Sequence, residues 1–333
     1  MTTPTPPFPR PQLLARLAGE RGHLLWAVTG LSETTLSDGL LHDDWHVKDI
    51  FPHIGRWDET FASWIPFMQA ERGQEIPILD DDTTNRGWHE AHKDYTLEQG
   101  VAVFLKGRAG LWAGLERLRD EEFEQPVTLA TGRVTKVRRW LAAAYRHDAE
   151  HAAEILAWRQ TNEVPRAPGP LYLVRALVRA TRKEFLAVAA NVPEAEQSSR
   201  PVCGVWTLQD VVGHIADWEQ YGVEGIEKVL AGETVITNPF GPDIPAWNDA
   251  HAAARQGQSW EQVWHDYQTT RQNFFYALDK LTQDDLSRPI HTPWGESTLY
   301  RWINIWTHHE REHAADLRRE LALPDTPDYL LPH

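Results

Sequence analysis

The sequence has little cysteine, a deficit of positive charge and no long apolar run. Its single cysteine, Cys203, excludes an internal disulfide framework and a cysteine-rich zinc site, and it suits a reducing compartment. Lys and Arg total 33 against 48 Asp and Glu, and the net charge of −15 disfavours nucleic acid and anionic membranes as partners. No run of 18 apolar residues is present, and the Pro-rich N-terminus lacks the basic and apolar regions of a signal peptide. We therefore expect a cytoplasmic protein that binds neither nucleic acid nor membrane.

Histidine and tryptophan, by contrast, are abundant at 16 residues each, and many of them recur at a fixed interval. The clearest set reappears 161 positions later and consists of Trp45, Asp49, His53, Ile54 and Trp57. Further pairs at offsets of 159 to 162 are Trp88 with Trp247, His92 with His251, Arg139 with Arg301, His147 with His309, and His151 with His313. Such self-similarity indicates a tandem repeat. We place the copies at 8–162 and 168–324, around the Pro- and Gly-rich linker 161–170.

Each copy is predicted to be an all-α four-helix bundle. Apolar residues at i, i+3, i+4 and i+7 mark an amphipathic first helix in each copy. The remaining helices are expected at 46–70, 97–119 and 135–160, and at 207–231, 260–281 and 298–321. Thr207 and Asp210 give the second of these sets a start that resembles a capping box, and Asp49 and Asp210 are expected to cap their helices. The polar stretches 72–95 and 232–257 are too long for simple loops, which indicates a long crossover.

Six recurring histidines are candidate metal ligands. Two of them in each copy stand at i and i+4, on one face of the last helix, and a third lies in the middle of the second helix. Three histidines from two helices leave coordination positions open, as in catalytic metal sites. The alternative is a set of hydrogen-bonded core histidines, which recurrence in both copies disfavours. The predicted ligands are His53, His147 and His151 in the first copy and His214, His309 and His313 in the second.

The stretch 309–313 also matches H-E-x-x-H, the signature of zinc proteases. The first copy has Asp148 in place of Glu310, and neither copy has the downstream third ligand of the common zinc proteases, so a protease is disfavoured. Asp148 and Glu310 remain candidates for a general base, or for an acid held beside the ligands.

Other recurring residues have two interpretations each. Trp57 and Trp218 either fill the core or line a substrate pocket, and Asn248 is a further pocket candidate. His92 and His251 are expected to support a ligand or to anchor a loop rather than to bind the metal. Cys203 has His42 at the matching position of the first copy, so a catalytic thiol is not expected.

The runs 206–219, 244–248 and 309–313 resemble the DinB/YfiT-like superfamily, of the DinB_2 type, and the resemblance covers the chain once per copy. It implies four helices running up, down, down and up, with the long crossover between the second and third. It also implies a metal held by the same six histidines. Characterised relatives include thiol S-transferases, isomerases, hydrolases and resistance proteins. Because relatives often pair as homodimers, the two copies are expected to pack as a pseudo-dimer, in a chain that is a monomer or a homodimer.

Together these features predict an enzyme that uses a divalent metal to activate water or a thiol against a small, reactive or toxic molecule, as a hydrolase or thiol S-transferase. One ion per copy is expected, Zn²⁺ or Ni²⁺ first, with Fe, Mn or Co as further candidates. A low-molecular-weight thiol is a possible cosubstrate, and Arg139 and Arg301 are candidates to bind its carboxylates. The alternatives are a non-catalytic protein that sequesters small molecules and has structural metal sites, and an interaction protein whose metals brace the bundles.

Overall fold

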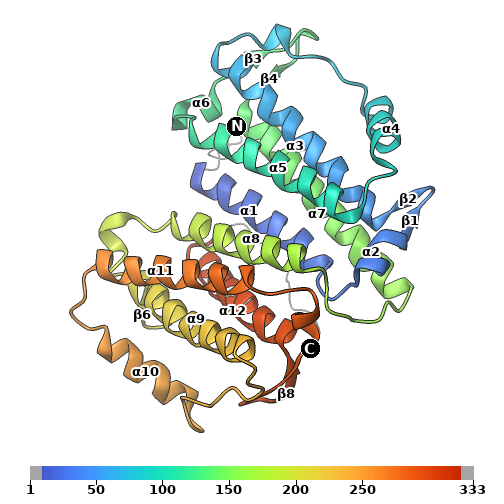
Figure 1. Cartoon of the computed structure of the whole chain (residues 1–333). Helices are drawn as coiled ribbons and strands as arrows, with labels where there is room; N and C mark the ends of the chain where they lie inside the picture. The colour runs from blue at the N-terminus through green and yellow to red at the C-terminus, as the bar shows by residue number, and fades with distance from the viewer. Residues whose placement is uncertain (1–9, 324–333) are drawn as a thin grey trace. The chain divides into compact units, whose positions relative to one another are not determined.

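The computed structural model describes residues 10–323, and these fall into two compact units that divide between Ala176 and Leu177. Both units consist of α-helices joined by loops and short antiparallel strand pairs, which confirms the predicted all-α class (Figure 1). The predicted domain limits at residues 8 and 324 lie outside the described residues. Within the described part of the chain, no helix has the length and apolarity needed to cross a membrane.

Four long helices form the first unit, namely α1 (Arg10–Ala27), α3 (Val47–Gln69), α5 (Leu97–Glu116) and α7 (Val137–Thr161). Helix α3 packs along α5, α1 packs along α7, and α3 also contacts α7 (Figure 1). The connections contain α2 (Glu33–Asp38), β1 (Leu40–His42), β2 (Trp45–His46), η1 (Gly73–Glu75), α4 (Asp81–His92), α6 (Asp120–Glu124), β3 (Val127–Thr128) and β4 (Val134–Thr135). The long helices begin and end within a few residues of the predicted ranges.

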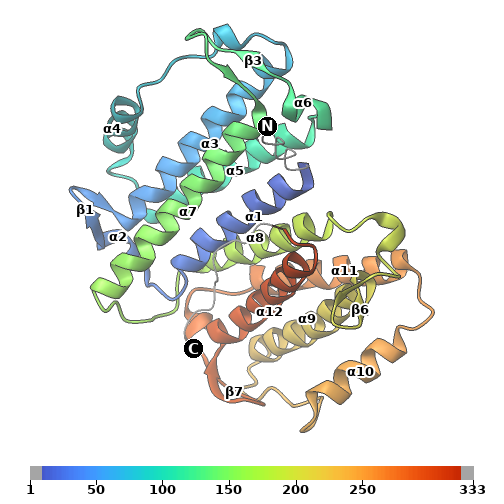
Figure 2. The ribbon, with the colours of Figure 1, turned by 180° about the vertical axis from the view of Figure 1, so that it is seen from behind.

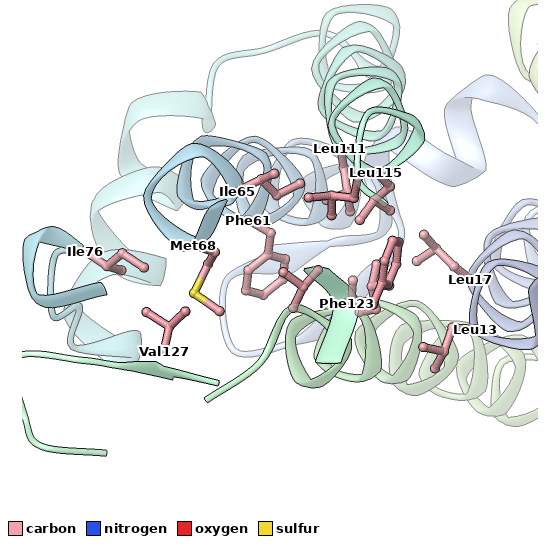
Figure 3. Close-up of a cluster of buried hydrophobic side chains, with 14 residues drawn as sticks. Leu13, Leu17, Phe61, Ile65, Met68, Ile76, Leu111, Leu115, Phe123 and Val127 are labelled. Carbon is pink, nitrogen blue, oxygen red and sulfur yellow. The ribbon is translucent and has the colours of Figure 1, made fainter. Parts of the chain in front are cut away.

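Apolar side chains from several of these helices fill one part of the first unit (Figure 3). Leu17 of α1, Phe61 of α3 and Leu111 of α5 meet there, and Phe123 of α6 joins them. Each fully buried side chain of this kind contributes roughly 1.5–3 kcal/mol to folding. The cluster therefore fixes the helices α1, α3 and α5 against one another.

A close approach between α3 and α5 depends on two glycines. A Cβ atom placed on Gly107 would lie 2.1 Å from the carbonyl oxygen of Gly55. No side chain fits at that distance, so glycine at this point allows the two backbones to come together. This contact lies two residues after His53 on α3.

The second unit has a similar order of long helices, strand pairs and a crossover helix. Its long helices are α9 (Leu208–Leu230), α11 (Trp260–Asp279) and α12 (Leu299–Glu320), preceded by α8 (Leu171–Ala189), in which the boundary between the units falls. Helix α9 packs along α11 and contacts α12 (Figure 2). The connections contain η2 (Glu194–Glu196), β5 (Pro201–Cys203), β6 (Trp206–Thr207), α10 (Ile244–Ala254), η3 (Asp284–Ser287), β7 (Pro289–Thr292) and β8 (Gly295–Thr298).

Side-chain caps fix the start of the helices that carry the central histidines. The backbone N–H of His46 donates to Asp49 Oδ2 at 2.8 Å, and that of Thr207 donates to Asp210 Oδ2 at 2.9 Å. Thr207 Oγ1 in turn accepts from the Asp210 N–H at 3.3 Å, which completes a capping box. These bonds confirm the predicted capping role of both aspartates.

The crossover in each unit contains a helix that the sequence analysis did not expect. Asp80 Oδ1 accepts from the Thr83 N–H at the start of α4, and Asp243 Oδ1 accepts from the Ala246 N–H at the start of α10. Both helices are short and largely exposed, so they show few buried apolar positions by which periodicity could identify them.

Candidate metal centres

Three histidines of the first unit converge at the contact between α3 and α7. His53 comes from α3, and His147 and His151 stand one turn apart on α7. The Nε2 atom of His147 lies 2.8 Å from that of His53 and 3.0 Å from that of His151. One nitrogen atom from each of the three rings lies within 4.8 Å of the other two, so the group could hold a metal ion.

The second unit brings together His214 of α9 with His309 and His313 of α12. The Nε2 atom of His309 lies 3.0 Å from that of His214 and 3.1 Å from that of His313. This group also satisfies the 4.8 Å limit. The structure thus assembles both histidine sets that the repeat pattern singled out.

Burial keeps most of these imidazoles neutral. Loss of solvent lowers the pKa of His53 to about 2, and the same cause lowers the pKa of His147 and of His214 to about 3. Desolvation likewise lowers the pKa of His309 well below its ordinary range, and it lowers that of His313. A neutral ring offers a lone pair for coordination, whereas an imidazolium does not.

The donor atoms fit an ion. Nitrogen ligands at roughly 2.0–2.1 Å from one ion lie about 2.8–3.4 Å apart, for angles at the ion between about 90° and the tetrahedral value. The bonded pairs of Nε2 atoms, 2.8 to 3.1 Å apart, are close to that range. Three neutral rings that point at one another cannot satisfy their nitrogens by hydrogen bonds alone, because each ring has one N–H. This donor set therefore suits a divalent cation that accepts imidazole.

A carboxylate supports one ligand of the first centre from behind. Glu154 Oε2 lies 2.9 Å from His151 Nδ1, the ring nitrogen opposite the one that faces His147. A carboxylate at this place fixes the orientation of the ring and makes its other nitrogen a better ligand. The sequence analysis did not identify Glu154.

The tryptophan candidates Trp57 and Trp218 each form a hydrogen bond with a crossover helix. The indole N–H of Trp218 donates to Asn248 Oδ1 of α10 at 2.9 Å, and the indole N–H of Trp57 donates to Asn85 Oδ1 of α4 at 2.9 Å. The Trp218 ring also lies 6.1 Å from that of His309. Trp218 and Asn248 are thus brought together, and Asn85 is the partner of Trp57 that the sequence analysis missed.

A cavity of about 410 Å³ opens between α3 and α4 in the first unit. Arg56, Glu59 and Thr60 of α3 line it together with Trp88 and His92 of α4. The same tryptophan and histidine also belong to the tightly packed group around His53. The cavity therefore lies next to the packed group that contains His53.

His92 and His251 hold their crossover helices together rather than joining the centres. His92 Nδ1 is hydrogen-bonded to the Trp88 carbonyl, and His251 Nδ1 lies 2.9 Å from the Trp247 carbonyl. The guanidinium of Arg56 donates to His92 Nε2 at 3.2 Å. These contacts agree with the anchoring role expected for both histidines.

Asp148 and Glu310 lie in buried ion clusters. In the first cluster Asp148 accepts hydrogen bonds from Arg21 at 3.0 Å and from Arg108 at 2.8 Å, and both arginines also bind Asp58. In the second cluster Glu310 pairs with Arg182 at 2.8 Å and Arg271 at 2.6 Å, and both arginines also bind Glu219. Asp148 and Glu310 are fully buried. Because their oxygens are engaged by guanidinium groups, this arrangement does not favour the predicted role of general base.

The two ion clusters occupy matching positions of the two units, a regularity that the sequence analysis missed. Arg21 with Arg182, Asp58 with Glu219, Arg108 with Arg271, and Asp148 with Glu310 are the corresponding pairs, at offsets of 161 to 163. The same self-comparison that found the histidines could have found them. Charged residues on helices are usually exposed, however, so their pattern alone does not indicate burial.

Arg139 and Arg301, the candidates for binding a thiol cosubstrate, are both exposed. Arg139 lies in the first turns of α7, and Arg301 has the same place in α12, two turns before the first histidine of each ligand pair. The structure shows no contact between either arginine and the histidines.

Comparison with known proteins bears on the second unit. The family model described as the DinB superfamily matches residues 177–317, which include α9, α11 and all three histidines of the second centre. No match was found among the curated proteins or among the solved structures.

Proposed function

Because residues 177–317 are a DinB superfamily domain, we propose that the chain is a divalent-metal-dependent enzyme that acts on a small molecule, as a hydrolase or thiol S-transferase. The observation that carries the proposal is the convergence of three imidazoles in each unit, all of them buried or half-buried. A structural site is typically closed by four protein ligands, whereas three leave room for a reactant.

The proposed ligands are His53, His147 and His151 in the first unit and His214, His309 and His313 in the second. When bound, a divalent ion would supply Lewis-acid activation of water or of a thiol. Residues of the chain would hold this ion and limit the access of solvent to it. The rings of Trp45 and Trp206 pack on His53 and His214, with centroids 5.2 and 4.7 Å apart, and they shield one side of each centre from solvent.

We propose that Trp57, Trp218 and Asn248 position the substrate. The bond between Trp218 and Asn248 joins the helix that carries His214 to the crossover helix, so that the indole face is fixed beside the second centre. In the first unit the cavity is lined by the ion pair of Arg56 and Glu59, and polar substrate groups would contact this pair there.

Asp148 and Glu310 enter the proposal as positioning residues. Each directly follows a ligand histidine in the chain, and each is bound by two arginines from other helices. They fix the rotation of α7 and α12, and therefore the direction in which His147 and His309 point.

The first experiment is elemental analysis of protein purified without a polyhistidine tag or nickel resin. We expect at least one metal ion per unit in the wild type, and two ions fewer per chain in the variant His53→Ala/His214→Ala. His265→Ala is the matched control, because this histidine is exposed on α11. A double variant that binds as many ions per chain as the wild type would refute the ligand assignment.

A second measurement separates the reaction types. The metal-loaded protein is incubated with electrophilic and ester substrates, with and without a low-molecular-weight thiol, and products are identified by mass. Addition of water supports a hydrolase, and thiol-dependent addition of the thiol supports a transferase. Turnover that survives in His53→Ala/His214→Ala would refute catalysis at these centres.

One observation favours a second function, the non-catalytic sequestration of an apolar ligand. Aromatic rings continue from Trp218 through Phe240 to Trp294, with centroids 5.3 and 5.6 Å apart, and Trp294 is 49% exposed. A pure binder would retain its ligand affinity without the histidines. Binding of an aromatic ligand by the double variant with undiminished affinity, and no turnover by the wild type, would support sequestration over catalysis.

A further inference from the structure

A second group of donor atoms lies on the opposite side of His313 from the three-histidine centre. It consists of the Cys203 thiol, the Asp316 carboxylate and the His313 ring, whose donor atoms are all within 4.8 Å of one another. Cys203 ends the strand β5, and this strand packs against α12, which carries His313 and Asp316 at i and i+3. The group therefore joins two elements of the second unit.

The ligand atoms of this group mainly contact one another. Cys203 Sγ is 3.5 Å from Asp316 Oδ2, and His313 Nδ1 is 3.9 Å from the same oxygen. The other carboxylate oxygen, Oδ1, accepts a hydrogen bond from Arg319. His313 is only 9% exposed, and its Nδ1 atom has no hydrogen-bond partner. A buried polar atom without a hydrogen-bond partner destabilises the fold. A bound ion would give His313 Nδ1 a partner, and Cys203 and Asp316 would supply that ion with further ligand atoms.

We propose that Cys203, His313 and Asp316 form an additional metal site in the second unit, which takes a divalent ion with affinity for sulfur, such as Zn²⁺ or Co²⁺. The proposal goes beyond the proposed function, because the three-histidine centres need neither Cys203 nor Asp316. One imidazole has two nitrogens, and His313 uses Nε2 toward His309 and Nδ1 toward the additional site. The two sites of this unit therefore share a ring.

Charge and donor type support the site. Binding releases the thiol proton and the Nδ1 proton to solvent, so the additional ion meets a thiolate, a carboxylate and the shared imidazolate. These three negative charges nearly offset the four positive charges of two divalent ions. Sulfur ligands select zinc and related ions over magnesium or calcium.

The first unit provides an internal comparison that lacks the thiol. His42 occupies the position of Cys203 and Glu154 that of Asp316. There, His42 Nε2 lies 3.2 Å from Glu154 Oε1, and His151 Nδ1 lies 2.9 Å from Glu154 Oε2. Both carboxylate oxygens are thus engaged, and no histidine nitrogen is left unpaired in this group. We assign the additional site to the second unit alone.

The test is a Co²⁺ titration of the reduced, tag-free, metal-free protein, followed by absorbance. A Co²⁺ ion bound to a thiolate gives a charge-transfer band in the near ultraviolet, and an ion bound to histidines alone does not. We expect the band in the wild type and its loss in Cys203→Ser, together with about one fewer ion per chain by elemental analysis. His42→Ser is the matched control and should retain the band.

Two further variants keep the outcomes separate. Asp316→Asn should weaken the affinity for the band-forming ion by about tenfold or more, as expected when a ligand carboxylate is lost. His53→Ala/His214→Ala should keep the band while it loses the other ions, and retention of those ions would refute the three-histidine centres without affecting this proposal. Co²⁺ binding by the wild type without the band, or a band that persists in Cys203→Ser, would overturn the additional site.

Discussion

Replacing Asp148 with asparagine should destabilise the first unit strongly, because it removes one charge from a balanced, buried set. The first ion cluster contains two arginines and two aspartates, and Asp148 accepts hydrogen bonds from Arg21 at 3.0 Å and from Arg108 at 2.8 Å. Asp148 is fully buried and Asp58 is 1% exposed, so solvent cannot take over the role of the lost carboxylate. Asp148→Asn therefore leaves an uncompensated positive charge in the core.

The magnitude follows from that geometry. Breaking a buried ion pair by removing one partner costs about 3–5 kcal/mol, and asparagine keeps one acceptor, which places the loss near about 3 kcal/mol. For a unit of this size the melting temperature should fall by roughly 6–12 °C. Glu150→Gln is the control. It removes the same charge from an exposed position of the same helix and should change stability by less than about 0.5 kcal/mol.

The assay is calorimetric unfolding of the metal-free protein, so that ligand binding does not contribute. A variant in which the charge is rebalanced, Arg108→Met/Asp148→Leu, should lose less stability than Asp148→Asn alone, since the remaining Arg21 and Asp58 still neutralise each other. An Asp148→Asn protein that melts with the wild type would refute the reasoning. An Asp148→Asn protein with wild-type stability and metal content but no turnover would instead support the general-base role.

Three further predictions concern packing, pH and the support of a ligand. Gly107→Ala should destabilise the first unit by about 1–3 kcal/mol in thermal melts, because its Cβ would lie 2.1 Å from the Gly55 carbonyl oxygen, while Gly110→Ala, with open space, should be neutral or stabilising by up to about 1 kcal/mol. The metal-free protein should lose stability as pH falls below about 6.5, because the unfolded chain then binds protons that the buried His53, of pKa about 2, does not; a flat profile from pH 7 to 4 would contradict this. Glu154→Gln should weaken metal binding in the first unit by about 10- to 100-fold, measured by competition with a chelator, and unchanged affinity would show that the contact with His151 does not support the ligand.

Periodicity and spacing predicted the long helices and the six histidines because both signals are local or repeat at a constant interval. The helix α9, expected over 207–231, runs from Leu208 to Leu230, and its T-x-x-D start forms the expected capping bonds. The i and i+4 spacing places the two histidines of α7, and those of α12, on one helix face. Their convergence with His53 and His214 was predictable because those residues were expected to point inward from the second helix of each copy.

Other features could not be read from spacing. The indole N–H groups of Trp57 and Trp218 bind asparagines that stand at different places relative to the neighbouring tryptophan: Asn85 comes three residues before Trp88, whereas Asn248 comes one residue after Trp247. The bond recurs while the sequence register shifts by one helical turn, so an alignment of identical residues misses it. The ion clusters escaped notice because burial of a charged residue is decided by tertiary partners that local sequence does not reveal.

The ion clusters also bear on what the proposed centres would bind. Asp148 and Glu310 directly follow ligand histidines, but each is neutralised by two arginines in its own cluster. Because a neutral imidazole ligand brings no negative charge, a divalent ion held by three of them would keep most of its charge. Such a centre favours anionic over neutral partners, which is the condition for activating water or a thiol near neutral pH. In the first unit the carboxylate of Glu154 beside His151, and in the second unit the carboxylate of Asp316 and the proposed thiolate at Cys203, would offset part of that charge.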